Sequence, residues 1–262
     1  MISFIIPAYN EAANLIPLLK NIDQLMTQKG YTYRFHIIND GSTDRICEEI
    51  EGLRSELPVD LYSHYPNRGV GEAFRVGFQR VLSLPEDKDQ VVVTMEADNT
   101  SDLQILNRML DKIREGSDVV LASCYAKKGE VRGTTFFRVL LSKGANFLLR
   151  IFLPIPNVRT YSSFYRVYRG GALRRVANRY GAKLITSHGF ECMVELLVKL
   201  AKEPELKISE VPMILDGAKR VGESKMRVLR TIYGFLSVIL RYGFLRRFQN
   251  PWSNWIAHRG SG

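Results

Sequence analysis

The alternation of short apolar runs with segments of helical spacing is the feature that most constrains the fold of this chain. Five apolar runs predict strands, and each of the first four is followed by a segment whose apolar residues recur at helical spacing. The runs are ISFIIPAY, FHIIND, VDLYSHY, QVVVTMEAD and SDVVLAS. This order predicts an α/β fold, with a mostly parallel central sheet and helices on both faces. Such sheets bind ligands beyond the carboxyl ends of their strands.

Two carboxylates end the fourth apolar run. Glu96 and Asp98 are two residues apart, and alternate residues of a strand point the same way, so both are expected to face one site. Like charges that close repel unless a cation lies between them. Mg²⁺ or Mn²⁺ would suit such a pair, because these ions take oxygen ligands and retain substrate phosphates. The alternative is an acidic loop whose polar residues 99–101 cap the next helix.

Polar residues also follow the first two runs and precede the C-terminal segment. Asp40, in IINDGSTD, can accept a hydrogen bond from a nucleobase N–H, or it can serve a turn and a helix cap. The segment RVGESKM, from Arg220 to Met226, brings two basic residues around a flexible glycine. Such a loop can close on a diphosphate, although it can also be a basic helix entrance.

The net charge of +10 is unevenly distributed. No acidic residue occurs from Val131 to Phe190, whereas eleven Lys and Arg residues lie in that stretch. A region of this kind attracts phosphates unless it is only a solvated basic surface. No nucleic-acid-binding motif accompanies it, so nucleic acid is not expected as a partner.

The C-terminal segment is predicted to be amphipathic. Ten uncharged residues separate Arg230 from Arg241, which as a helix is about 15 Å and too short to span a bilayer. One predicted face holds Arg227, Arg230, Thr231, Gly234, Ser237 and Arg241, and the other holds Leu229, Ile232, Leu236, Ile239 and Leu240. The helix is expected to lie on anionic lipid, to pack its apolar face on the domain, or to combine the two.

Size and composition favour one domain at residues 1–225 and a helical segment at 226–262. Three widely spaced cysteines indicate a reducing compartment without a disulfide framework. The N-terminus lacks a basic region before its apolar run, so it predicts a first strand rather than a signal peptide.

Eight segments in the same order resemble the family 2 inverting glycosyltransferases, and within them the branch of dolichol-phosphate mannose synthases. The segments are IPAYNE, INDGSTD, NRGVGEA, MEADNT, FRVLLSKGAN, RTYSSFYRVYR, SEVP and RVGESKM. The resemblance covers about Ile2 to Met226 and implies a GT-A fold that transfers a hexose from a GDP-mannose or UDP-glucose type of donor to a polyprenyl phosphate. Together with the amphipathic C-terminal segment, it predicts a peripheral enzyme on the cytoplasmic face of a membrane.

The same resemblance assigns roles to individual residues. It places the nucleotide sugar near Pro7, Tyr9, Glu11, Asp40, Gly71, Ala97, Arg220 and Lys225. It places the metal at Glu96 and Asp98, with Asp98, Arg220 and Lys225 as the residues that assist catalysis. It places the acceptor phosphate at Arg138 and Ser142.

The chain departs from its family at three points. Glu96 replaces the first aspartate of the DXD motif, Ala122-Ser123-Cys124 replaces Gly-Ser-Arg, and Thr160 replaces the aspartate of an Asp-x-x-Ser-Gly-Phe-Arg pattern. The last two changes leave the identity of the acceptor open. A phosphate acceptor needs no strong base, since its second pKa is about 6. A hydroxyl acceptor would need one, and Glu191 or Glu195 would be the candidates. A soluble transferase for hydroxyl acceptors and a non-catalytic membrane- or nucleic-acid-binding relative are therefore the alternatives.

Overall fold

The computed structural model describes residues 1–223, 225 and 228–248, with side chains described as far as residue 243. Ser224 and Met226 of the predicted basic loop lie outside the described residues. Arg227 and residues 249–262 of the predicted C-terminal segment also lie outside them.

A seven-stranded sheet forms the centre of the molecule. Its spatial order is β3 (Val59–His64), β2 (Tyr33–Asp40), β1 (Ile2–Ala8), β4 (Val91–Thr94), β7 (Arg166–Arg169), β5 (Val119–Ser123) and β8 (Ile208–Pro212). β7 runs antiparallel to both of its neighbours, and the other neighbouring pairs are parallel. The prediction of a mostly parallel sheet is therefore confirmed. A separate parallel ribbon pairs β6 (Glu130–Arg132) with β9 (Ile214–Asp216).

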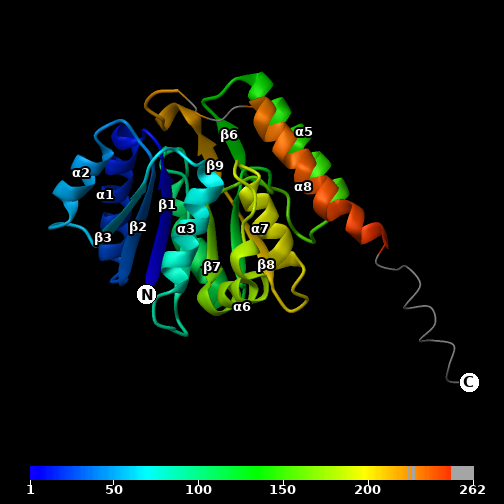
Figure 1. Cartoon of the computed structure of the whole chain (residues 1–262), viewed down its shortest axis with the longest axis horizontal. Coiled ribbons are helices and arrows are strands. Elements are labelled where there is room, and N and C mark those ends of the chain that lie inside the picture. Colours follow the sequence, from blue (N-terminus) through cyan, green and yellow to red (C-terminus); the bar gives the residue numbers. More distant parts are fainter. Residues whose placement is uncertain (224, 226–227, 249–262) are drawn as a thin grey trace, which may run out of the picture.

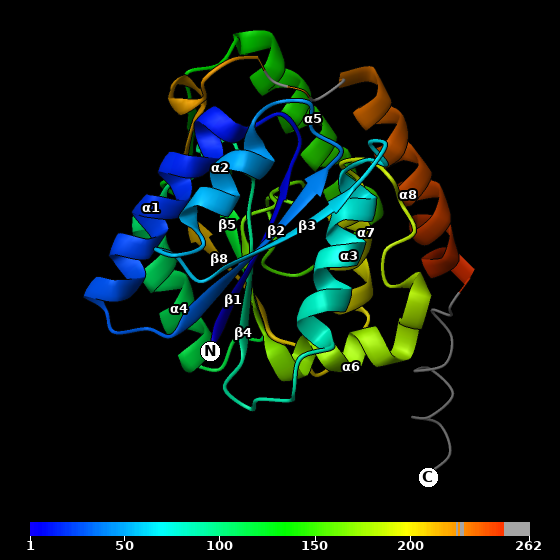
Figure 2. The ribbon, with the colours of Figure 1, turned by 60° about the vertical axis from the view of Figure 1, so that its left-hand side comes forward.

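Helices cover both faces of this sheet (Figures 1 and 2). One face packs against α1 (Ala12–Gln28), α2 (Ile46–Leu53) and α4 (Leu106–Arg114). The other packs against α3 (Val70–Leu82), α6 (Gly170–Tyr180) and α7 (Cys192–Ala201). Short 3₁₀ turns span Leu103–Ile105, Gly181–Lys183 and Gly217–Lys219. Outside α7, α5 (Phe136–Phe152) and α8 (Val228–Phe248) lie side by side.

Alternation along the strands divides the apolar core into two clusters. In β1, Phe4 and Ile6 point to the cluster under α1 and α2, whereas Ile5 points to the cluster under α3. In β4, Val93 and Val92 divide in the same way. The central strands are apolar on consecutive positions because both of their faces are buried.

The strand order reverses between β1 and β4. The chain leaves β1 toward β2 and leaves β4 toward β7 and β5, so the two following loops part and open a crevice at the carboxyl edge. This is the position at which doubly wound sheets bind ligands. Tyr9–Glu11 and Asp98 lie on its two sides.

β4 is shorter than its sequence predicts. The strand ends at Thr94 rather than continuing to Asp98. The Asp98 carboxylate accepts the Thr100 N–H (3.1 Å), and Asn99 adopts a positive φ of 60°, so a turn replaces the strand. Strand alternation therefore does not set the directions of Glu96 and Asp98, and the expectation that both face one site stays a prediction. Asp102, rather than residues 99–101, caps the following turn by accepting the Gln104 N–H (2.9 Å).

The outer helix α8 turns a mixed polar and apolar side inward. Thr231, Phe235 and Val238 are buried, whereas Leu229 is 83% exposed and Leu240 is 68% exposed. The predicted apolar face is therefore divided: Leu229 and Leu240 do not pack on the domain, whereas Ile239 packs against its core. In the part of the chain that is described, no helix has the length and apolar character needed to cross a bilayer.

A buried ion pair lies within α7, and its carboxylate also contacts α8. Glu195 and Lys199 are fully buried and form a salt bridge one helical turn apart. The Glu195 carboxylate also accepts the backbone N–H groups of Thr186 (3.0 Å) and Ser187 (2.8 Å) and the Tyr242 hydroxyl of α8 (3.1 Å). Burial alone would raise the pKa of Glu195, but these donors and the Lys199 charge outweigh it and lower the pKa to about 2.

We expect Lys199→Met to lower the free energy of unfolding at pH 7 by about 3 kcal/mol, because it leaves the buried carboxylate with only the exposed Arg241 guanidinium, 3.9 Å away, as a cation. The double variant Glu195→Gln/Lys199→Met should recover most of that loss, since it removes both charges. Chemical denaturation measures both values. A double variant as unstable as Lys199→Met would show that the charges are not what couples the two residues.

The same pair should also make stability depend on acid pH. The folded-state pKa of Glu195 lies below its ordinary value of 4.5, so its contribution is complete above pH 4.5 and is lost as the pH falls toward 2. Glu195→Gln should flatten this part of the stability profile. An unchanged profile would contradict the assignment.

Candidate functional site

The loops after β1 and β2 are tied together at the carboxyl edge of the sheet. Asn10 adopts a positive φ of 54° and its side-chain oxygen accepts the N–H groups of Thr43 (2.7 Å) and Asp44 (3.2 Å). In return the Ser42 hydroxyl accepts the Asn10 N–H (2.9 Å). These reciprocal hydrogen bonds hold the two loops in a fixed relative position at the edge.

Asp40 holds the turn at residues 67–69, next to these two loops. Its carboxylate accepts the N–H groups of Arg68 (2.7 Å) and Gly69 (2.9 Å), and it lies 2.6 Å from His64 Nε2. Gly41 fits beneath because a Cβ there would lie 2.6 Å from the Asn67 nitrogen. The predicted contact of Asp40 with a nucleobase stays a prediction, and the structure adds a role in holding the 67–69 turn.

Glu96 and Asp98 have different partners. Glu96 accepts the Phe164 N–H (3.2 Å) and the Ser101 hydroxyl (3.3 Å), and burial raises its pKa. Asp98 accepts the Thr100 hydroxyl (2.7 Å) on one oxygen and binds the Arg220 guanidinium through the other. Glu96 therefore supports the loop before β7, whereas Asp98 faces the basic loop.

The basic loop closes over the crevice between β1 and β4. Val221 makes a reciprocal pair of hydrogen bonds with the Asn14 side chain, at 2.7 and 2.9 Å. Lys225 binds the Glu11 carboxylate (2.7 Å), and Arg220 binds Asp98. Residues more than 200 positions apart in the sequence thus meet at one edge. Sequence reasoning missed Asn14, because an asparagine inside a predicted amphipathic helix carries no signal of a distant partner.

Arg220 is prepared to bind more than Asp98. Its side chain is 21% exposed, and its Nε atom is buried without a hydrogen-bond partner among the described atoms. A buried donor without a partner is costly, and an anion that accepted from it would remove that cost. Together with Lys225, it makes the carboxyl edge suited to a diphosphate.

A divalent ion fits Asp98 better than it fits the predicted pair. No group of three or more His, Cys, Asp or Glu side chains that could hold a metal occurs among the described residues. Mg²⁺ commonly uses one or two carboxylates together with substrate phosphates, so Asp98 and a diphosphate would suffice. The Asp98 carboxylate already pairs with one cation, Arg220. Ligation by Glu96 stays a prediction.

The remaining donor-side predictions fall into two groups. Pro7 and Tyr9 lie at the end of β1 and just beyond it, and Tyr9 is 37% exposed. Gly71 and Ala97 are buried. The Gly71 N–H donates to the His188 carbonyl (2.9 Å), and a Cβ there would lie 1.9 Å from the Ser187 oxygen. Close packing thus explains this glycine.

The predicted acceptor residues lie on α5. Arg138 is exposed and Ser142, one turn later, is half-buried. The Tyr125 hydroxyl donates to the Ser142 hydroxyl (2.7 Å). Asn146, which is buried, donates to the Ser142 carbonyl (2.9 Å) and accepts the Tyr161 N–H (2.7 Å). Sequence reasoning did not single out Tyr125.

Glu191 and Glu195, the two candidate bases, both make contacts that serve the fold. Glu195 is buried in the ion pair with Lys199, so it is not available to a substrate. Glu191 accepts the Gly189 N–H (3.1 Å) and lies against Gly234 of α8. His188 contributes its carbonyl to the first turn of α3.

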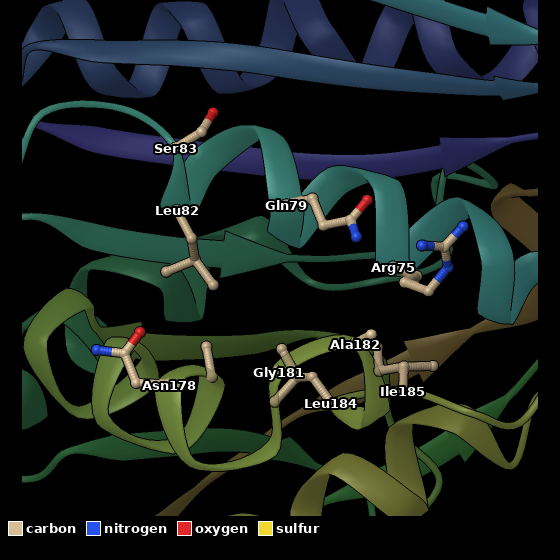
Figure 3. Close-up of a pocket in the computed structure, with 10 residues that line it drawn as sticks. Arg75, Gln79, Leu82, Ser83, Asn178, Gly181, Ala182, Leu184 and Ile185 are labelled. Carbon is tan, nitrogen blue, oxygen red and sulfur yellow. The ribbon is translucent and has the colours of Figure 1, made fainter.

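A separate hollow of about 280 Å³ lies between α3 and α6 (Figure 3). Its lining consists of Arg75, Gln79, Leu82, Ser83, Ala177, Asn178, Gly181, Ala182, Leu184 and Ile185. The Arg75 guanidinium at its side is paired with Glu72. The hollow follows the flanks of the helices and contains none of the predicted site residues, so it is not assigned to the same function.

Two curated proteins resemble most of the chain. The dolichol-phosphate mannosyltransferase of Pyrococcus furiosus is 32% identical over 92% of this chain. The polyprenol monophosphomannose synthase of Mycolicibacterium smegmatis is 28% identical over 85% of it. The chain spans 63% of the length of the first relative and 79% of the second.

Solved structures match the fold at lower identity. Glucosyl-3-phosphoglycerate synthase from Mycobacterium tuberculosis, in complex with Mn²⁺, UDP and glucosyl-3-phosphoglycerate, superposes with a TM-score of 0.66 at 18% identity. The match covers 93% of this chain and 80% of that one. The same enzyme with Mg²⁺ and UDP gives a TM-score of 0.64. The model of the family described as glycosyl transferase family 2 matches residues 3–177, so this chain belongs to glycosyl transferase family 2.

Proposed function

We propose that this chain transfers a hexose, with inversion, from a nucleotide diphosphate sugar to a polyprenyl phosphate. The observation that carries the proposal is the basic loop closed over the carboxyl edge, with the Arg220 Nε atom buried and unpartnered. A diphosphate leaving group is the anion that this arrangement suits. The names of the two curated relatives support the polyprenyl phosphate acceptor and favour mannose as the sugar.

On the donor side, Arg220 and Lys225 bind the diphosphate and stabilise its charge as the glycosidic bond breaks. Asp98 holds the divalent ion, which when bound neutralises part of the same charge. When Arg220 leaves Asp98 and binds the diphosphate instead, the Asp98 carboxylate is free to hold the ion. Asn14 keeps the loop in place through Val221.

On the acceptor side, Arg138 and Ser142 place the phosphate behind the anomeric carbon. A phosphate dianion is itself a nucleophile near neutral pH, so no side chain has to remove a proton. The hydroxyl reaction needs an accessible base, and of the two candidates Glu195 is buried, which leaves only the half-buried Glu191 for it.

The surface formed by α5 and α8 supports a place on the membrane. Among the side chains described there, eleven large apolar ones are exposed: Phe136, Phe137, Leu140, Phe147, Leu148, Ile151, Phe152, Leu229, Tyr233, Leu236 and Leu240. The exposed basic residues Arg138, Lys143, Arg150 and Arg230 lie on the same two helices. Apolar residues flanked by cations suit the interface of an anionic bilayer. We place the enzyme on the cytoplasmic side, where its three free cysteines would stay reduced.

The proposal predicts which substrates give product. With a panel of nucleotide sugars, Mn²⁺ and a short polyprenyl phosphate, nucleotide release should depend on both the metal and the lipid phosphate. Chelation of the metal should lower turnover by at least about a hundredfold, since charge stabilisation of this kind contributes that much. Product analysis identifies the sugar and the anomer. Equal turnover with plain sugar acceptors would overturn the lipid-phosphate acceptor in favour of a hydroxyl.

Substitutions at Asp98 and in the basic loop test the donor site. Asp98→Ala should lower kcat by about 10³-fold, and Arg220→Met should weaken binding of the nucleoside diphosphate about tenfold even without metal, because a charge-assisted hydrogen bond is lost. Calorimetry measures the binding and a coupled assay the turnover. Asp111→Ala is a matched control, as this exposed carboxylate pairs only with Arg114 on α4. An active Asp98→Ala enzyme would remove the assigned role of Asp98.

Vesicle binding tests the membrane surface. Phe147→Glu/Leu240→Glu should reduce co-sedimentation with anionic vesicles at least tenfold, because two exposed apolar side chains lose their contact with lipid. Gln28→Glu/Gln104→Glu introduces the same charge at exposed positions on the opposite face and should bind as the unaltered chain does. Equal loss in both variants would show that net charge alone is responsible.

A further inference from the structure

The helix that carries the predicted acceptor residues has few apolar contacts to hold it. Of the seventeen residues of α5, only Asn146 and Leu149 are buried. Polar links must therefore fix the position of its second and third turns. Two such links reach the turn of Ser142, one to its backbone and one to its side chain.

The backbone link comes from Asn146. Its amide donates to the Ser142 carbonyl (2.9 Å) and to the Ser162 hydroxyl (3.2 Å), and its oxygen accepts the Tyr161 N–H (2.7 Å). The helix is thereby joined to the segment before β7. This link fixes the position of α5 relative to the segment before β7. It does not involve the Ser142 hydroxyl, which it leaves free to rotate.

The side-chain link comes from Tyr125, which lies two residues beyond β5 and is half-buried. The Tyr125 hydroxyl donates to Ser142 Oγ (2.7 Å). A serine hydroxyl has one proton and two acceptor positions. When Tyr125 occupies one acceptor position, it restricts the rotation of that hydroxyl and polarises its remaining proton for donation.

The turn that carries Tyr125 is itself held firmly. The Tyr125 N–H donates to Thr160 Oγ1 (3.3 Å), and that hydroxyl lies 2.7 Å from Ser123 Oγ. Ser123 Oγ in turn accepts the Ala126 N–H (3.0 Å). Ser123 and Thr160 are both buried. Tyr125 is therefore presented from a rigid position at the end of β5, and α5 is aligned to it.

We propose that Tyr125 is a positioning residue for the acceptor phosphate, acting through the Ser142 hydroxyl. The tyrosine fixes the direction in which Ser142 donates and holds the Ser142 turn against the end of β5. Arg138, one helical turn earlier, supplies the charge, and Ser142 supplies an oriented neutral donor. This assignment rests on the proposed function, since it presumes that a phosphate binds at α5.

The test separates acceptor binding from donor binding. Tyr125→Phe keeps the ring and removes only the hydroxyl. We expect it to raise the KM for a short polyprenyl phosphate about tenfold, the usual effect of losing one such hydrogen bond. The KM for the nucleotide sugar and the Tm should not change. Tyr31→Phe is the matched control, because it removes a hydroxyl that bonds Arg114 far from α5 and should leave both KM values unchanged.

A double variant distinguishes positioning from independent binding. If Tyr125 acts through Ser142, Tyr125→Phe/Ser142→Ala should have the same acceptor KM as Ser142→Ala alone. Effects that multiply would overturn the proposal, as would an unchanged acceptor KM in Tyr125→Phe. A lowered Tm with unchanged KM values would show a structural link only and would also overturn it. If the unaltered chain fails to use polyprenyl phosphate at all, the proposed function fails, and this assignment fails with it.

Discussion

The reversal of strand order between β1 and β4 is the constraint on which the rest of the structure depends. It opens the carboxyl edge of the sheet, because the loops that leave these strands run in opposite directions. Carboxylates collect on both sides of the opening, Glu11 after β1 and Asp98 after β4. Like charges at one edge require cations. The chain supplies them from Arg220 and Lys225, which the fold brings back over the crevice.

The fold could be predicted from sequence because each of its signals is local. Apolar runs of six to nine residues and helical spacing between them are read without knowledge of distant contacts, and they specify a mostly parallel sheet. The edge at which ligands bind follows from that topology alone. The identity of the residues after β1, β2 and β4 then locates the candidate site within a few positions.

The directions of side chains could not be predicted, since they depend on contacts between remote segments. Glu96 faces the loop before β7 because it accepts the Phe164 N–H, a partner 68 positions away. Asn14 bonds Val221 across 207 positions. Gly71 is explained by the approach of residues 187 and 188. Of the departures from the family pattern, Cys124 directly precedes Tyr125 in the sequence. Thr160 meets Tyr125 only in three dimensions, where it accepts the Tyr125 N–H.

In the stretch from residue 131 to 190, which has no acidic residue, some of the basic side chains are buried and others are exposed. Arg166 is fully buried and donates to three backbone carbonyls, those of Tyr161, Ser163 and Met193. Arg169 and Arg174 also donate to carbonyls at helix and strand ends. These arginines serve the fold, because a guanidinium offers five donors to groups that would otherwise be buried without partners.

The charges of that stretch that remain exposed on α5 are Arg138, Lys143 and Arg150. They share the helix with exposed phenylalanines and leucines, so cations and apolar side chains meet on one surface. A lipid phosphate has the same two parts, an anion joined to a hydrocarbon chain. In the proposed reaction, α5 binds the anion through Arg138 and the Ser142 hydroxyl and binds the hydrocarbon chain through its apolar residues. The nucleophile then reaches the sheet edge while its tail stays in the bilayer. The weak apolar packing of α5 on the domain is then the condition for this arrangement, and the polar links from Tyr125 and Asn146 are what keep the helix in register with the donor site.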